Sequence, residues 1–425
     1  MSNAEKTAIR LLLTNWEIRR IKDVCDTTSG GTPSRSKAEY YDLGTIPWIK
    51  TGELKHKYIF ETEEKITEVA LQQSSAKLVP KNSVLMAMYG ATIGKTSINK
   101  IEATTNQACC AMIPKGKLEP EFLYYVLSSN KDKIVALGAG GAQPNISQQI
   151  IREIEIPFPP QEEQQKIVSI LTSVDEAIEK AEAIIEQTEK VKKGLMQQLL
   201  TKGIGHTKFK KTEIGEVPEE WSVLTLGDVT SESAFGPRFP ADKYDLNGNY
   251  ALLRTTDISE AGEINYRTMP LANLPEDKFQ KHALERGDLL VTRSGTCGIV
   301  CVFEDNNKPV IPGAFLIRFR VNNLALPQFL GIFMMSDLGQ NKIQTMASGG
   351  VQKNLSGTNL KKLIIPLPTI TEQKEIVTTI KVFENKINNE KKSLQQLHVL
   401  KKGLMQSLLT GKVRVKVDET EVTQV

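Results

Sequence analysis

The stretch Gly90-Ala91-Thr92-Ile93-Gly94-Lys95-Thr96 carries the residue types most suggestive of chemistry, because it ends in Gly-Lys-Thr like a phosphate-binding loop. Such a loop needs four residues between its glycines, and this stretch has three. Residues 97–101 are strand-like, so no helix N-terminus would face a phosphate. The corresponding residues 295–299 of the second half contain no lysine. We therefore interpret the stretch as a tight turn and keep an enzyme that binds nucleotide here as the less favoured alternative.

Other patterns typical of catalysis or metal binding are missing from the sequence. The four histidines are scattered, with no His-Glu-x-x-His pattern and no Gly-x-Ser-x-Gly nucleophile turn. Residues 138–141 lack the glycine spacing of a dinucleotide-binding loop. The five cysteines form no metal-ligand set, and we interpret them as reduced, mostly buried thiols of a cytosolic protein. The sequence thus predicts no catalytic residue, no metal and no cofactor held by this chain.

The composition is that of a folded protein with more than one domain. The chain has 425 residues, 54 basic and 50 acidic side chains, a net charge of +4 and 40% hydrophobic residues. Disorder as the main state is excluded, since it needs low hydrophobicity or a large net charge. No apolar run approaches the roughly 18 residues of a membrane span. The length predicts at least two domains, and the weak net charge means that nucleic-acid binding would depend on locally placed basic residues.

The sequence repeats itself, so the chain is predicted to contain two copies of one unit of about 200 residues. The offset is 209 residues in the later part of each copy and 205 in the earlier part, as a small insertion or deletion would produce. A period this long indicates duplication of a whole module. The matches are Glu163-Gln164 with Glu372-Gln373, residues 192–197 with 401–406, residues 140–147 with 349–356, Trp16 with Trp221, and Gly90 with Gly295.

Each copy is predicted to consist of a mixed α/β part followed by a long helix. The mixed parts, residues 16–155 and 221–365, alternate short β-branched runs with Gly and Pro turns, and a helix is expected near residues 121–129. Residues 161–201 contain no proline, and their apolar residues recur in steps of three and four, which is the seam of a coiled coil. Forty-one helical residues span about 60 Å. The second helix has the same register and is expected to cover this seam, the alternative being two separate core helices.

The seam positions are candidates for the spacer and for docking a partner. Lys192, Glu390 and Lys401 interrupt the apolar pattern and are expected to set the register or to lie at an open end. The candidate positions are Ile167, Leu171, Val174, Ile178, Ile185, Leu195, Ile376, Ile380, Phe383, Ile387, Leu394 and Leu404.

Glycine-rich loops with basic, amide and aromatic residues recur at matching places in both copies, which points to recognition. Arginine reads guanine and Asn or Gln reads adenine through paired hydrogen bonds, while Lys contacts phosphate. A polar loop or structural turn is an equally good interpretation of any one of these residues. The candidate DNA-binding residues are Arg35, Lys37, Lys50, Tyr89, Lys95, Gln143, Asn145, Arg238, Arg254, Arg293, Gln352, Lys353 and Asn354.

With these motifs the chain resembles the specificity subunit of a Type I restriction–modification system over nearly its whole length. The most specific features are the helix start Pro-Pro-x-x-Glu-Gln at residues 159–164, degraded at 368–373, and the helix end Lys-Lys-Gly-Leu-Met-Gln-x-Leu-Leu-Thr at 192–201 and 401–410. Residues 212–221 also resemble the start of a target recognition domain in that family. Residues 1–15 do not copy that start.

The resemblance implies an α+β fold with two globular α/β target recognition domains, separated by two long helices that form an antiparallel coiled coil with an internal pseudo-two-fold repeat. It also implies that each domain reads half of a bipartite DNA site, and that the helices dock two methyltransferase subunits before restriction subunits join. S-adenosylmethionine, ATP and magnesium would belong to those partners, and the location would be cytoplasmic. The expected parts are a first recognition domain (1–160), a central helix (161–203), a linker (204–220), a second recognition domain (221–368), a C-terminal helix (369–411) and a flexible tail (412–425).

A second alternative is a stand-alone two-domain scaffold that binds DNA or protein without methyltransferases. Its discriminating observation is whether a methyltransferase co-purifies with the chain. The recognised bases do not follow from the sequence, because the loop register is unknown and DNA shape adds specificity at positions that the protein does not contact.

Lengthening both helices by one turn is expected to widen the non-specific gap between the half-sites and to leave both half-sequences unchanged, because the helix pair acts as a spacer. Methylation-site sequencing of DNA from cells that express the lengthened chain with its partner subunits measures the gap and the half-sequences together. Altered half-sequences would contradict the spacer role.

Overall fold

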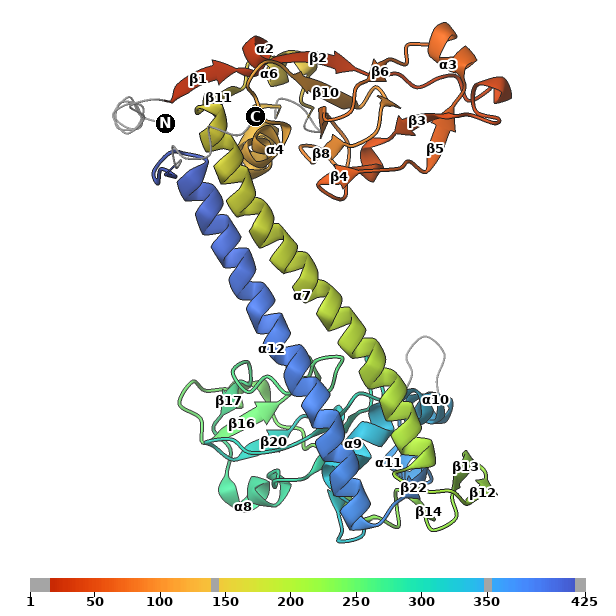
Figure 1. Ribbon diagram of the computed structural model, residues 1–425. Coiled ribbons are helices and arrows are strands. Elements are labelled where there is room, and N and C mark those ends of the chain that lie inside the picture. The colour runs from red at the N-terminus through yellow and green to blue at the C-terminus, as the bar shows by residue number, and fades with distance from the viewer. Residues whose placement is uncertain (1–15, 139–144, 348–353, 417–425) are drawn as a thin grey trace. The chain divides into compact units, whose positions relative to one another are not determined.

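The computed structural model describes residues 16–138, 145–347 and 354–416, and the chain divides into two compact units. Unit 1 comprises residues 1–182 and 392–425, and unit 2 comprises residues 183–391. Each unit therefore combines one α/β domain, called domain 1 or domain 2 below, with part of both long helices, α7 (Gln161–Lys202) and α12 (Ile370–Leu408) (Figure 1). No helix in the described part of the chain has the length and apolar character needed to cross a membrane.

Domain 1 contains two small sheets and a separate strand pair. The first sheet has the order β2-β10-β7-β8-β4 and the second the order β5-β3-β9-β6. Strand β1 (Glu17–Arg20) pairs with β11 (Glu155–Phe158) next to the start of α7 (Figure 1). The remaining strands are β2 (Cys25–Ser29), β3 (Ile46–Ile49), β4 (Tyr58–Ile59), β5 (Glu64–Ile66), β6 (Leu78–Val79), β7 (Val84–Ala87), β8 (Thr96–Asn99), β9 (Ala103–Thr105) and β10 (Cys109–Pro114), and the helices are α2 (Ile21–Val24), α3 (Glu68–Gln73), α4 (Pro120–Ser129), α5 (Lys131–Leu137) and α6 (Gln148–Arg152).

Domain 2 repeats this topology, as the sequence repeat predicts. Its sheets have the orders β15-β21-β18-β19 and β17-β16-β20, and β14 pairs with β22 as β1 pairs with β11. In both domains one strand pair of the second sheet is parallel, β3 with β9 and β16 with β20. The strands are β14 (Ser222–Thr225), β15 (Thr230–Phe235), β16 (Tyr250–Leu253), β17 (Leu271–Ala272), β18 (Leu289–Thr292), β19 (Val300–Val302), β20 (Val310–Pro312), β21 (Leu316–Val321) and β22 (Ile364–Leu367), and the helices are α8 (Glu276–Phe279), α9 (Pro327–Met335), α10 (Asp337–Met346) and α11 (Gly357–Leu360).

The central strand of each domain is buried on both faces, because successive side chains of a strand point to opposite sides. In β7, Val84 and Met86 belong to the hydrophobic cluster that also contains α4, whereas Leu85 and Ala87 belong to a second cluster. In β18, Leu289 and Val291 belong to the hydrophobic cluster that also contains α9, whereas Leu290 belongs to a second cluster. The helix expected near residues 121–129 is confirmed as α4. Each central strand, β7 or β18, is formed by a short apolar run that is bounded by turns.

The two long helices are antiparallel in each unit. In unit 1, Asp175 of α7 pairs with Lys401 of α12 at 2.6 Å. In unit 2, Lys192 pairs with Glu384 at 3.1 Å and Glu189 pairs with Lys391 at 2.9 Å. The first two ion pairs are equivalent, because Asp175 and Glu384, and likewise Lys192 and Lys401, are 209 residues apart. The lysines that interrupt the apolar seam therefore set the register by pairing across it.

A buried glutamate connects each domain to the start of its helix. Glu163 accepts the indole N–H of Trp16 at 2.8 Å, and Glu372 accepts that of Trp221 at 2.9 Å. The other carboxylate contacts come from the segment that follows the opposite long helix: Arg414 donates two hydrogen bonds to Glu163, and Ile204 N–H donates to Glu372 at 2.9 Å. Each glutamate thus joins a domain, its own helix and the end of the other helix.

The glutamine after each glutamate fixes the loop that precedes the domain's main helix. Gln164 accepts the backbone N–H of Glu119 at 2.9 Å and donates to the carbonyl of Pro159 at 2.9 Å. Gln373 repeats both bonds, accepting from Leu326 at 2.7 Å and donating to Pro368 at 2.9 Å. The duplicated Glu-Gln motif is therefore structural.

Two segments that were expected to be a linker and a flexible tail make ordered contacts. Residues 204–220 contain a hairpin of β12 (Phe209–Thr212) and β13 (Gly215–Pro218), whose Val217 is buried in the core of domain 2. Residue Arg414, near the start of the tail, pairs with Glu163 of α7 at 2.7 Å and so fixes this part of the tail. Residues 417–425 lie outside the described residues.

We expect Gly203→Ala to destabilise the chain more than Gly205→Ala. Both glycines have positive φ, +64° and +75°, so alanine costs about 1–2 kcal/mol at either position. At Gly203 an added Cβ would also lie 2.5 Å from Glu372 Oε1 and 2.8 Å from Trp221 Cζ2, an overlap worth about 1–3 kcal/mol more. At Gly205 nothing lies within 4 Å. Calorimetric unfolding of the full chain measures the difference, and equal losses would contradict the tight packing around Glu372.

Candidate nucleic-acid interface

Both domains place the end of the glycine-rich loop against the turn that follows the central strand. In domain 1, Asn145 forms a β-bridge with Tyr89, and Ile146 N–H donates to the carbonyl of Met88 at 2.8 Å. In domain 2, Asn354 forms a β-bridge with Ser294, and Leu355 N–H donates to the carbonyl of Arg293 at 3.0 Å. The recurring loop therefore has a shared backbone framework. Gln143, Gln352 and Lys353 lie outside the described residues.

The turn at residues 90–95 is part of an antiparallel hairpin and is not a phosphate-binding loop. It connects β7 to β8, which pair with each other, so a strand follows the turn where a nucleotide site needs a helix. Gly90 and Gly94 have φ of +82° and +72°, a backbone region that glycine enters without steric cost. Lys95 is exposed, and no described residue pairs with its ammonium group. It is thus available to a ligand from outside the chain.

In domain 1 the other basic candidates are bonded to the chain's own acidic and aromatic groups. Arg35 lies over the ring of Tyr41 at 4.3 Å and pairs with Glu64 at 2.6 Å. Lys50 pairs with the same carboxylate at 2.7 Å. The hydrogen bonds from Lys50 and Arg35 hold the pKa of Glu64 below its usual value. Lys37 donates to the hydroxyl of Tyr40 at 2.9 Å, which raises the lysine pKa.

In domain 2 the three arginine candidates have different surroundings. Arg254 makes a paired contact with the buried Asp257, with Nε–Oδ2 and Nη2–Oδ1 distances of 3.0 and 2.8 Å, so its guanidinium mainly holds the local turn. Arg238 is exposed and has no side-chain partner among the described residues. Arg293 lies over the ring of Phe235 at 4.4 Å and donates from Nε to Asn354 Oδ1 at 3.3 Å. Arg238 and Arg293 are therefore the arginines of this set without a carboxylate partner.

A cleft of about 520 Å³ in domain 2 is lined by two of these arginines, Arg238 and Arg254, and not by Arg293. Its wall includes Arg238, Arg254, Phe239, Tyr244 and Phe315. Phe315 is 55% exposed and Tyr244 is 48% exposed, so the cleft combines exposed aromatic rings with the guanidinium of Arg238, which has no described side-chain partner, as a binding surface would. Phe239, Tyr244 and Phe315 were not among the sequence candidates; the available signal was the pair of phenylalanines that flank Arg238, Phe235 and Phe239.

Strand register shows how the two domains differ at equivalent positions of this surface. Ser29 pairs with Cys110, and Phe235 pairs with Ile317 at the same place in the repeat. The N–H of Met88 donates to the carbonyl of Ala108, and that of Arg293 donates to the carbonyl of Phe315. Ser29, Met88 and Ala108 of domain 1 are thus replaced by Phe235, Arg293 and Phe315 in domain 2. The framework is shared, whereas the side chains presented on it are not.

The seam residues of the long helices are mostly buried within the units. Ile167 and Leu171 belong to the core of domain 1, and Ile376 and Ile380 belong to that of domain 2. Ile178, Ile185 and Ile387 are buried as well, whereas Val174, Leu195, Phe383, Leu394 and Leu404 are partly exposed. The seven buried seam residues pack within the helix pair and against the two cores. This packing leaves little of their surface for another subunit.

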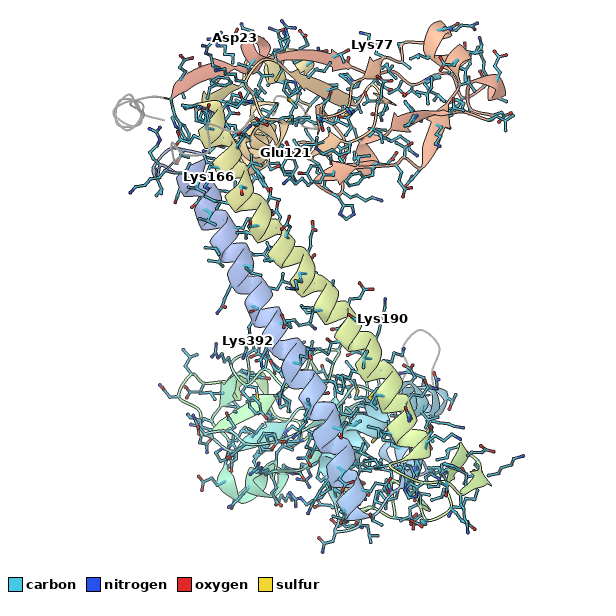
Figure 2. All side chains as sticks on the ribbon, in the orientation of Figure 1. Asp23, Lys77, Glu121, Lys166, Lys190 and Lys392 are labelled. Carbon is cyan, nitrogen blue, oxygen red and sulfur yellow. The ribbon has the colours of Figure 1, made fainter. Side chains whose placement is uncertain are left out.

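Other helix residues present apolar or charged side chains to the outside. Val191 and Leu400 are each 50% exposed and are 209 residues apart, so one exposed apolar side chain occurs at the equivalent helix position of each unit. Lys190, labelled in Figure 2, is exposed next to Val191 and pairs with Glu186 of the same helix at 2.7 Å. This repeated apolar pair was not among the sequence candidates, because it lies outside the seam pattern.

The fold and the repeated loops define a two-domain recognition protein, and comparison with known proteins gives its family. A family model described as the Type I restriction modification DNA specificity domain matches residues 14–190 and again residues 218–399. The chain therefore belongs to the family of Type I restriction–modification specificity subunits. It is the non-catalytic DNA specificity subunit of such a system and a member of a Type I restriction–modification complex. Specificity subunits of this family generally carry no cofactor.

Two relatives and two solved structures illustrate the similarity. The MjaVIII specificity subunit of Methanocaldococcus jannaschii is 29% identical over 416 residues, which cover 95% of this chain and 94% of the relative. The EcoKI specificity subunit of Escherichia coli is 23% identical, covering 94% and 89%. The crystal structure of the specificity subunit from M. genitalium has a TM-score of 0.56 at 19% identity and covers 93% of this chain and 96% of that one. A structure concerned with complex assembly and conformational transition of the type I system has a TM-score of 0.60 at 16% identity and covers 94% of this chain and 99% of that one. The structures show that the fold is the same.

Arg414→Met is expected to destabilise unit 1 at neutral pH and to do so much less at acid pH. Burial acts to raise the pKa of Glu163, but the hydrogen bonds from Arg414 and Trp16 outweigh it and lower the pKa below its usual value. The stabilisation is therefore complete above the pKa of an unfolded glutamate, about 4.3, and is lost as the pH falls through the lower folded-state pKa. We expect a loss of about 2–4 kcal/mol at pH 7, less than for a fully buried pair because Arg414 is 35% exposed.

The measurement is calorimetric unfolding of the full chain at pH 7 and at acid pH. Lys190→Met is the matched control, since it removes an exposed ion pair within one helix, worth about 0.3–0.5 kcal/mol. A loss for Arg414→Met that is the same at both pH values would show that its pairing with Glu163 is not the source of the stability.

Proposed function

We propose that each domain reads one half of a bipartite, asymmetric DNA site, and that the long helices dock methyltransferase subunits. The observation that carries the proposal is the pair of equivalent surfaces with different side chains. Met88 and Ser29 occupy the backbone positions at which domain 2 has Arg293 and Phe235. One framework that presents different hydrogen-bonding groups suits two different half-sequences, because base edges are distinguished by their donors and acceptors.

Docking of two methyltransferase subunits is supported by the apolar pair on the helices. Val191 and Leu400 repeat at an offset of 209 and are equally exposed, so two copies of one partner would find the same apolar contact. Restriction subunits would then join this assembly in the cytoplasm. S-adenosylmethionine, ATP and magnesium would be held by those partners.

Binding to DNA need not come from a large net charge. Several basic side chains of domain 1 are neutralised within the chain, as Arg35 and Lys50 are by Glu64. The unpaired groups Lys95, Arg238 and Arg293 supply local positive charge at the loops. Contacts of the basic partner subunits with phosphate would add the sequence-independent part of the affinity.

Exchanging residues 16–155 for the corresponding segment of another family member is expected to change one half-site and to preserve the other, because each domain carries its own recognition loops. Methylation-site sequencing of DNA from cells that express the chain with its partner subunits gives the motif directly. The unexchanged chain is the control and should produce a bipartite methylated adenine motif. A change in both halves would contradict independent reading, and the absence of any motif, with no methyltransferase co-purifying, would favour a stand-alone scaffold.

A further inference from the structure

Domain 2 contains a cluster of side chains that domain 1 lacks at the same backbone positions. Phe235, Arg293 and Phe315 stand where domain 1 has Ser29, Met88 and Ala108. Met88 and Ala108 are 7% and 6% exposed, whereas Phe235 and Phe315 are 45% and 55% exposed. Exposed aromatic rings cost solvation without contributing to a core. The ring of Phe235 lies against Arg293, which indicates a role in holding that side chain toward a ligand, whereas Phe315 is joined to Arg293 through the backbone.

The guanidinium of Arg293 is held in a defined orientation. Its Cζ lies over the ring of Phe235, 4.4 Å from the ring centroid, and its Nε donates to Asn354 Oδ1 at 3.3 Å. Asn354 is itself fixed by its β-bridge with Ser294. Within the described residues, neither Nη1 nor Nη2 has a hydrogen-bond or ion-pair partner. The two outer nitrogens are thus presented together, and little rotational freedom is lost when they bind.

Several other arginines of domain 2 are bonded to carboxylates, whereas Arg238 and Arg267 are exposed but have no aromatic ring contact in the described chain. Arg254 is paired with Asp257, Arg318 with Glu232, and Arg286 with Glu304. Arg35 of domain 1 provides the closest comparison, because it also lies over an aromatic ring, yet its guanidinium is neutralised by Glu64. Arg293 combines ring stacking, an amide contact and the lack of a described carboxylate partner.

We infer that Arg293 is a base-reading residue of domain 2 and that it recognises a guanine in the half-site of that domain, an inference that rests on the proposed function. A fixed guanidinium edge with two free N–H donors matches the O6 and N7 acceptors of guanine in the major groove, the commonest specific contact of arginine. Phe235 and Asn354 are positioning residues, since they act on the base through Arg293. Domain 1 has Met88 at this position and reads its half-site with other groups.

The test is methylation-site sequencing of DNA from cells that express the full chain with its methyltransferase subunits, comparing wild type with Arg293→Ala. The wild-type half-site assigned to domain 2 by the domain exchange should contain a fixed G·C pair. Arg293→Ala should relax that one position, with a loss of discrimination of about 5- to 150-fold between guanine and the other bases. The half-site of domain 1 should remain unchanged, which also shows that the variant chain folds and assembles.

Two further variants make the result specific. Phe235→Leu should relax the same position in part, because the guanidinium loses its stacking surface. Arg267→Ala should leave the motif unchanged, since Arg267 is an exposed arginine of the same domain without an aromatic partner in the described chain.

Three outcomes would overturn the inference while leaving the proposed function intact. These are a domain 2 half-site without a fixed G·C pair, a motif unchanged by Arg293→Ala, and a uniform fall in methylation with an unchanged motif, which is the signature of a phosphate contact. A wild-type chain that yields no bipartite motif at all would instead contradict the proposed function.

Discussion

The buried glutamate at the start of each long helix is the group on which the arrangement of each unit depends. Glu163 and Glu372 each accept the indole N–H of the tryptophan that begins the domain, and each is also bonded to the segment after the opposite helix. A carboxylate with so little exposed surface is stable only when donors surround it. Domain, helix start and the end of the other helix must therefore meet at one point, and ion pairs such as Asp175–Lys401 keep the helix register beyond it.

The repeat and the long helices could be predicted from the sequence, because duplication and a coiled-coil seam both leave a period that extends over many residues. Strands such as β4 and β6 could not, since two residues carry no period. The lysines at 192 and 401 interrupt the seam recognisably in the sequence, but their partners lie 192 and 226 residues away and follow only from the three-dimensional pairing. The same holds for Arg414, whose role depends on Glu163.

The sequence could predict which kinds of residue would serve as recognition candidates. It could not predict which of their side chains would be left without a partner in the folded chain and so be able to bind a ligand. Arg254 and Arg293 look alike in the sequence, yet the first is bonded to Asp257, whereas both outer nitrogens of the second lack a partner among the described residues. Availability depends on which acidic and aromatic side chains the fold brings close: Asp257 lies three residues from Arg254, whereas Phe235 reaches Arg293 from a distant strand, β15. Phe235 shows this most clearly, because its exposure and its contact with Arg293 are properties of the folded chain that its place in the sequence does not indicate.

The glycine-rich loop is joined to the central strand turn through main-chain atoms, with Ile146 bonded to Met88 and Leu355 bonded to Arg293. Such bonds form whatever side chain stands at residue 88 or 293, because they use only the amide and the carbonyl. A substitution at Arg293, which lies outside the buried core, would therefore keep this backbone bond, whereas Met88 is only 7% exposed and packs in the core of domain 1. In evolutionary terms, a domain that reads DNA through this position, as we propose for Arg293, could change its target by substitution there while its backbone framework is kept.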